Sequence, residues 1–144
     1  MSFESALYTH LTGLSGITAV VSTRIYQEIA PTDVEKPYIT WSIISDVPTG
    51  HIYIESGIAK KVVQFDVFAE TDLTVNSAED ALRNGIDGFS GTMGSGSHTI
   101  VVHSIRKKNS FQRMIPPSDG SQRAIYRRMA EYSFWHREVV PTLA

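Results

Sequence analysis

The sequence predicts an α+β fold in which two helices pack on one face of a mostly antiparallel sheet, in the order α-β-β-β-α-β-β. Two segments repeat apolar residues at helical spacing, and five segments alternate in polarity or are rich in β-branched and aromatic residues. Each amphipathic helix needs an apolar surface to cover, and one face of the sheet supplies it. At 144 residues, we expect a single domain spanning 1–144.

The two helices are expected over residues 3–14 and 75–87. Residues 17–21 are expected to form a short apolar turn under the first helix, and the glycine-rich segment 91–97 a flexible connection to the next strand. Both helices carry one apolar stripe with the same spacing: Phe3, Ala6, Leu7, Leu11 and Leu14 in the first, and Ala78, Ala81, Leu82, Ile86 and Phe89 in the second.

The five strands are expected at 24–28, 38–45, 61–69, 99–106 and 124–137. The last strand has one face made of Ala124, Tyr126, Ala130, Tyr132 and Phe134, and Arg128 is the single charged interruption on that face.

Two connections are longer than a small domain needs, and such connections are typically functional or disordered. Residues 46–60 predict a hairpin that extends beyond the sheet, and residues 107–122 predict a long basic loop. We expect both to contact a neighbouring protomer or another partner, although their apolar residues could also fold back onto the domain. The candidate interface residues are His51, Ile52, Tyr53 and Ile54 in the hairpin, and Lys107, Lys108, Phe111, Arg113, Met114 and Ile115 in the loop.

The sequence offers no motif for catalysis, a cofactor or a metal. It has no cysteine, and its five histidines lack the spacing of a metal site. The glycine-rich segment lacks the lysine and the following helix of a phosphate-binding loop, and no Gly-x-Ser-x-Gly elbow is present. The N-terminus does not resemble a signal peptide, and no apolar run is long enough to span a bilayer. We therefore expect a non-enzymatic, soluble protein made in a cytoplasm.

Charge is unevenly distributed along the chain. Residues 1–96 hold five basic and twelve acidic residues, a net charge of −7, whereas residues 97–144 hold eight basic and three acidic residues, a net charge of +5. The two halves could interleave within one domain and cancel, or an acidic surface of one protomer could meet a basic surface of its neighbour. The sequence pI of about 6.2 argues against a dedicated nucleic-acid-binding protein.

An ordered series of short motifs resembles a known family. Val21–Tyr26 contains a Val-x-x-Arg-Ile-Tyr stretch, Ala30-Pro31 precedes a Pro-Tyr pair at Pro37-Tyr38, and Val63–Ala69 reads Val-Gln-Phe-Asp-Val-Phe-Ala before a helix. This series resembles the phage tail-completion family, the tail terminators or tail-to-head joining proteins of long-tailed phages and prophages. The resemblance covers most of the chain through about residue 89.

The resemblance implies a structural protein of the virion tail or neck, assembled in the host cytoplasm. It implies a homo-oligomeric ring, typically a hexamer, that caps the finished tail tube and offers the head a docking surface. The partners would be further copies of the chain, the tail tube protein and a head–tail connector or neck protein. DNA would pass through the ring without specific binding. The alternatives are another neck component, such as a head-closure protein, and a small nucleic-acid-binding domain.

Overall fold

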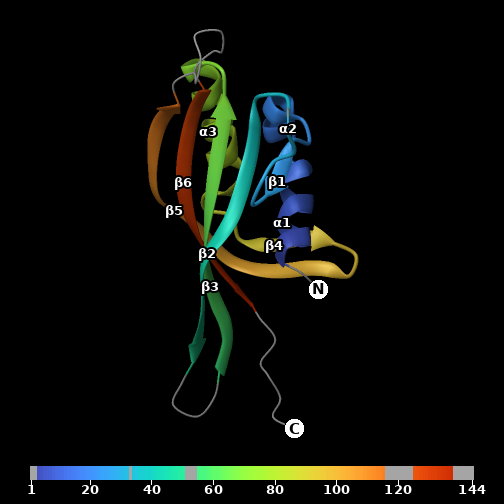
Figure 1. Ribbon diagram of the computed structural model, residues 1–144. Coiled ribbons are helices and arrows are strands. Elements are labelled where there is room, and N and C mark those ends of the chain that lie inside the picture. The colour runs from blue at the N-terminus through green and yellow to red at the C-terminus, as the bar shows by residue number, and fades with distance from the viewer. Residues whose placement is uncertain (1–2, 33, 51–54, 116–124, 138–144) are drawn as a thin grey trace.

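The computed structural model describes residues 3–32, 34–50, 55–115 and 125–137. Three helices and six strands follow one another along these residues (Figure 1): α1 (Phe3–Thr12), α2 (Ser15–Val21), β1 (Ile25–Gln27), β2 (Tyr38–Gly50), β3 (Glu55–Ala69), α3 (Asp72–Ile86), β4 (Gly91–Ser95), β5 (His98–Ile115) and β6 (Ile125–Arg137). None of these helices has both the length and the apolar character needed to cross a bilayer.

The predicted fold class is wrong, because the structure is a six-stranded mixed half-barrel with three helices. The strands lie in the order β1-β2-β3-β6-β5-β4, and β1 pairs with β2 in parallel while the other four pairings are antiparallel. Residue patterns identify strands but carry little information on the direction in which a short edge strand pairs. The parallel pairing of β1 was therefore not predicted.

Two predicted connections are regular structure. Residues 17–21, expected to be a turn, belong to α2, which buries Ile17 and Val21. Part of the glycine-rich segment forms β4, which pairs with the start of β5. Gly94 fits there because its φ is +91° and a Cβ atom at this position would lie 2.0 Å from the carbonyl oxygen of His98. The backbone of β4 thereby approaches α1 closely, with Ala6 3.0 Å from the same Cβ position.

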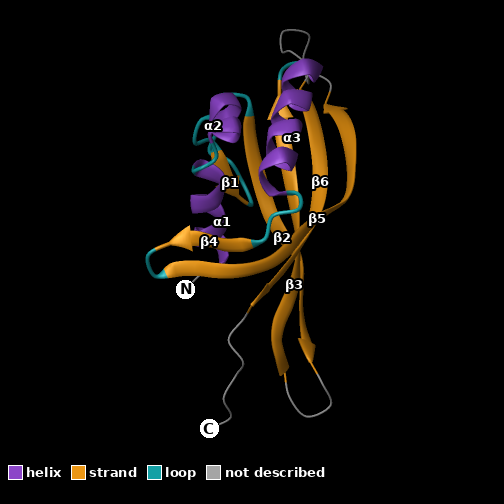
Figure 2. Cartoon of the chain, turned by 180° about the vertical axis from the view of Figure 1, so that it is seen from behind, coloured by secondary structure: helices purple, strands orange, loops and turns teal. Residues whose placement is uncertain are grey.

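The helices cover one face of the sheet and leave the other face uncovered (Figure 2). The covered face carries the aromatic core, in which the rings of Phe65 and Tyr132 lie 5.7 Å apart and edge-on. Phe3 of α1 meets Phe134 of β6 in the same manner at 5.5 Å. Such edge-to-face pairs add to the large stabilisation that aromatic burial provides.

Helix α3 begins three residues earlier than predicted because Thr71 caps it. The hydroxyl oxygen of Thr71 accepts a hydrogen bond from the backbone N–H of Thr74 at 3.2 Å. Asp72, in the first turn, places a negative charge near the positive end of the helix dipole. Three residues of the predicted stripe, Ala78, Leu82 and Ile86, are buried in α3, whereas Ala81 and Phe89 are partly buried and Phe89 lies beyond the end of the helix.

Candidate assembly surfaces

Residues 46–50 and 55–60 form the outer part of a long hairpin made by β2 and β3. Figure 1 shows the two strands continuing below the helices as an arm. Within it Asp46 faces Lys61, Val47 faces Lys60, and Gly50 faces Glu55 at the last described pair. The predicted interface residues His51, Ile52, Tyr53 and Ile54 lie outside the described residues. The arm therefore consists of paired strands up to the point where the candidate residues begin.

The root of the arm is fixed to the body by two lysines on opposite faces of β3. The Lys61 ammonium lies 3.2 Å from the Asp46 carboxylate, 3.2 Å from His136 Nε2 and 5.2 Å from the centre of the Phe3 ring. The Lys60 ammonium lies 5.4 Å from the centre of the Trp135 ring on the other face. Attraction between a cation and an aromatic face thus joins the root of the arm to α1 through Phe3 and to β6 through Trp135.

The predicted loop at 107–122 is wrong over its first nine residues, which are the second half of β5. Residues 109–115 pair with β6, from Asn109 opposite Glu131 to Ile115 opposite Ile125. This half contains polar residues on both faces, so it lacks the alternation that identifies a strand. Residues 116–122 lie outside the described residues.

Among the predicted loop residues, Lys107 points into the protein. Its ammonium donates to Glu79 Oε1 at 2.7 Å, and its backbone N–H donates to Asp87 Oδ1 at 3.0 Å. Lys108 and Phe111 are exposed, and the Phe111 side chain is 46% exposed. Arg113, Met114 and Ile115 belong to β5, but the positions of their side chains lie outside the description. The six candidates of the predicted loop thus separate into one half-buried residue, two surface residues and three placed only by their backbone.

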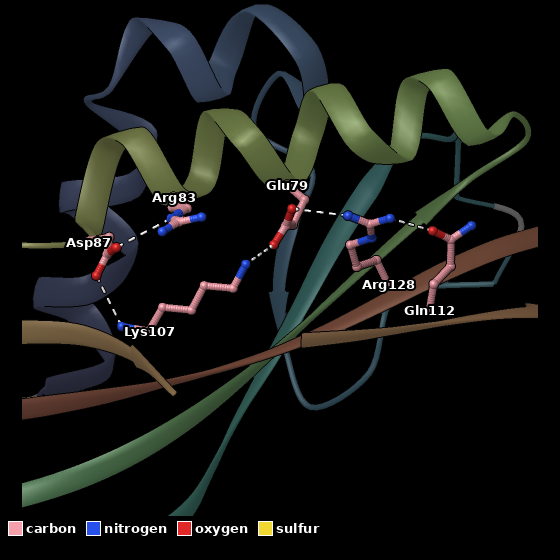
Figure 3. A network of polar contacts seen from close by, with 6 residues as sticks. All are labelled: Glu79, Arg83, Asp87, Lys107, Gln112 and Arg128. Atoms are coloured by element: carbon pink, nitrogen blue, oxygen red, sulfur yellow. Dashed lines mark hydrogen bonds and ion pairs between the residues drawn. The ribbon is translucent and has the colours of Figure 1, made fainter. Parts of the chain in front are cut away.

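Lys107 belongs to a polar network under α3 that the sequence analysis did not identify. Figure 3 shows Glu79 of α3 between Lys107 of β5 and Arg128 of β6. Arg128 Nη1 lies 3.2 Å from Glu79 Oε2, and Arg128 also donates to Gln112 Oε1. The Glu79 side chain is only 5% exposed, and two cations balance the negative charge of its buried carboxylate.

The protonation of Glu79 follows from these contacts. Burial alone would raise the pKa of Glu79, but the hydrogen bonds and positive charges of Lys107 and Arg128 outweigh it and hold the pKa below the ordinary value of 4.5. The carboxylate therefore stays ionised at neutral pH. The network thereby joins α3 to strands β5 and β6.

In the sequence, Arg128 is the residue that could have indicated this network. It interrupts an otherwise apolar strand face, and a charge on a buried face requires an opposite charge nearby. Its partner could not be found by spacing, because Glu79 lies 49 residues away along the chain.

Some of the opposite charges of the two halves of the chain meet within one protomer. Cations of residues 97–144 pair with acids of residues 1–96 inside one protomer: Lys107 with Glu79, Arg128 with Glu79, and Arg127 with Asp66 at 2.7 Å. The two halves thus interleave and partly neutralise each other.

The uncovered face of the sheet carries a second cluster. Arg127 packs over the Phe68 ring at 5.3 Å, and Phe68 stacks on Tyr38 with ring centres 4.8 Å apart. A hollow of about 230 Å³ opens beside them, lined by Glu28, Ile29, Ala30, Pro31, Tyr38, Thr40, Asp66, Phe68 and Arg127. The Asp66 carboxylate is used by Arg127 and by Gln64, whose amide donates to it at 3.0 Å.

The described residues contain no group of three or more His, Asp or Glu side chains that could hold a metal ion. A second hollow of about 380 Å³ lies between α1 and the strands β1 and β2, lined by Glu4, Ser5, Tyr8, Thr9, Gln27 and Trp41. Neither hollow brings together a nucleophile, a base and an oxyanion donor as an acyl-transfer site requires.

Comparison with known proteins assigns the chain to a family. The profile of the family described as Tail completion protein gp17 matches residues 5–96, more than half of the 144 residues. The chain belongs to this family of phage tail completion proteins. It is therefore a structural protein of the phage tail, located in the virion, and the resemblance carried by residues 21–69 is confirmed.

A solved structure agrees with this tail completion fold. A chain in the virion of a native gene transfer agent particle superimposes with a TM-score of 0.73, over 94% of this chain and 95% of that chain. The two sequences are 14% identical, so the likeness concerns the fold. No curated protein matches the sequence.

Proposed function

We propose that this tail completion protein caps the finished tail tube as a closed ring of six copies, the number that the resemblance implies, and provides the surface to which the head is joined. The tail tube protein binds one face of the ring, and a connector or neck protein binds the other. DNA passes through the ring without sequence-specific contacts. Family membership supports a structural role in the tail, and the ring and its partners are the step beyond it.

The observation that carries the proposal is the arm. A hairpin that leaves the body as paired strands has little to pack on within its own protomer, and its apolar residues then suit a partner. Val47, on β2 of the arm, is 52% exposed. A closed ring needs head-to-tail interfaces, in which each protomer presents one surface to a different surface of its neighbour. A projecting arm is suited to one side of such an interface.

The arm can be tested without disturbing the core. Deletion of Thr49–Glu55 should leave a folded protein that no longer caps tails, and Val47→Asp should weaken assembly by placing a charge in the interface. Val101→Asp is the matched control, because Val101 is a 37% exposed valine on β5 opposite β4, away from the arm.

Assembly is read by negative-stain imaging of the purified protein, alone and mixed with tail tubes, and folding by circular dichroism. The proposal expects rings on tube ends with the wild-type protein and with Val101→Asp. Normal capping by the deletion variant would remove the arm from the account, and wild-type protein that never binds tube ends would overturn the capping role.

A further inference from the structure

Both edges of the sheet are only partly covered by strands. At one edge, β1 pairs with three residues of β2, from Ile39 to Trp41. At the other edge, β4 pairs with β5 only over 98–102. Within the described chain, no strand pairs with the outer edge of β2 from Ser42 onward or with that of β5 from His103 onward.

Part of the β5 edge is closed by the end of α3. The N–H of Gly88 donates to the carbonyl of Ile105 at 2.7 Å, and the N–H of Lys107 donates to Asp87 at 3.0 Å. Beyond Lys107 the described structure shows no such cover, which leaves residues 109–115 as the open segment of this edge. On β2 the open segment is 42–47, because Pro48 has no N–H to donate.

The direction of the backbone groups at the open β5 edge follows from the register. Ser110, Ala130, Phe65 and Trp41 lie in one row across the sheet, and hydrogen bonding alternates between neighbouring pairs of strands. Since the carbonyl of Trp41 faces the β1 edge, where it accepts from Glu28 at 2.8 Å, the backbone groups of Ser110 face the opposite edge. The N–H of Ser110 therefore points away from β6.

Long open edges attract other strands, and soluble proteins blunt them with proline, inward charges or very short strands. The 109–115 segment contains neither proline nor glycine and pairs with β6 in regular register, whereas the 42–47 segment contains one register shift, between Ile43 and Ser45. Large exposed apolar side chains occur on both open segments: Ile44 and Val47 on β2, at 49% and 52%, and Phe111 on β5, at 46%. Both edges thus have the character of surfaces that are covered in the assembled state.

We propose that residues 109–115 of β5 in one protomer pair with residues 42–47 of β2 in the next protomer, so that a continuous sheet runs around the ring. This inference rests on the proposed ring. The partner is a second copy of the chain, because each protomer carries both edges, they are similar in length, and successive antiparallel pairings make β2 and β5 run in opposite directions. The new pair is therefore antiparallel, the more stable arrangement.

The offset between the two segments suits a closed sheet. If the segments pair end to end, Ser110 of one protomer meets Val47 of the next, whereas within one protomer Ser110 shares a row with Trp41. From β2 of one protomer to β2 of the next, the register therefore shifts by about five to six residues along the strand, or roughly 17–20 Å. The same step crosses four strands, which together are about 19 Å wide. The strands would tilt by about 40–45°, which falls close to the range of closed β-barrels.

The test removes one hydrogen-bond donor at the open edge. Ser110→Pro lacks the outward N–H but leaves the pairing of β5 with β6 intact, whereas Ser110→Ala keeps the N–H. We expect the proline variant to show the cooperative thermal unfolding of a folded monomer but to give about tenfold fewer rings, or none, in negative stain. The alanine variant should form as many rings as the wild type. Rings from Ser110→Pro would overturn the edge pairing.

Cross-linking tests the same pairing when Ser110→Pro impairs folding. The chain contains no cysteine, so Val47→Cys combined with Ser110→Cys provides the only thiols. Oxidation should give a ladder of covalent oligomers from the double variant, while each single variant stays monomeric, because a head-to-tail interface keeps identical residues apart. Wild-type rings with no ladder would overturn the edge pairing and leave the ring proposal standing. A wild-type protein without rings would overturn both.

Discussion

Replacing Glu79 by glutamine would test the network that fastens α3 to the sheet. The substitution keeps the shape of the side chain and one acceptor oxygen but removes the negative charge. Lys107 and Arg128 would then face each other without compensation, at positions now 2.7 Å and 3.2 Å from the two carboxylate oxygens.

The size of the effect follows from burial. Removing one partner of a fully buried ion pair costs about 3–5 kcal/mol, because the remaining charge is left unpaired. Here the Lys107 and Arg128 side chains keep 17% and 23% of their surface exposed and can regain some water. We therefore expect a loss of about 2–4 kcal/mol in the free energy of unfolding, or about 6–12 °C in Tm for a domain of this size.

The assay is denaturant unfolding at pH 7 and at acid pH, with Asp80→Asn as the matched control. Asp80 is an exposed acid on the same helix, so its neutralisation should change stability by less than about 0.5 kcal/mol. The folded pKa of Glu79 is depressed, so its contribution is complete above the unfolded pKa near 4.5 and disappears as the pH falls through the folded value. The difference between wild type and Glu79→Gln should shrink accordingly. An effect no larger than that of Asp80→Asn, or one independent of pH, would refute this reasoning.

Denaturant unfolding also checks three further substitutions. Gly94→Ala should lower the free energy of unfolding by about 2 kcal/mol or more, because the new Cβ would meet the His98 carbonyl and the positive φ disfavours alanine. A variant as stable as the wild type would show that β4 is placed wrongly. Gly16→Ala should stabilise the protein by about 0.5–1 kcal/mol, because nothing lies within 4 Å of its Cβ position in α2, and a loss would mean that α2 is not helical. Thr71→Ala should cost about 1 kcal/mol through loss of the cap on the Thr74 N–H, and a neutral result would contradict the cap.

The sequence predicts elements with a strong period better than it predicts their connections. The stripes of α1 and α3 and the alternation in β3 and β6 identify these four elements, because one face of each is buried. Helix α2 has only seven residues, too few for a stripe to repeat. Strand β4 is built from glycine-rich sequence whose use depends on close contact with α1, and such tertiary contacts have no local signature.

The predicted interface residues near the end of β5 lie in a different structural setting from the loop expected for them. Phe111 is an exposed aromatic residue, but on the edge of a sheet rather than on a loop. Lys107 reads as a surface cation in the sequence and is instead drawn inward by Glu79. Long-range ion pairs and the outer edges of a sheet depend on which strands become neighbours, and this order follows from the folded topology rather than from residue spacing.

The capping role is tested most directly by tube growth. Tail tubes polymerised in vitro would be incubated with the protein, supplied with fresh tube protein, and measured by electron microscopy. Our account predicts a ring on the tube end and no further elongation, with Val101→Asp behaving as the wild type and the Thr49–Glu55 deletion allowing growth. Tubes that elongate equally with and without the wild-type protein would contradict it.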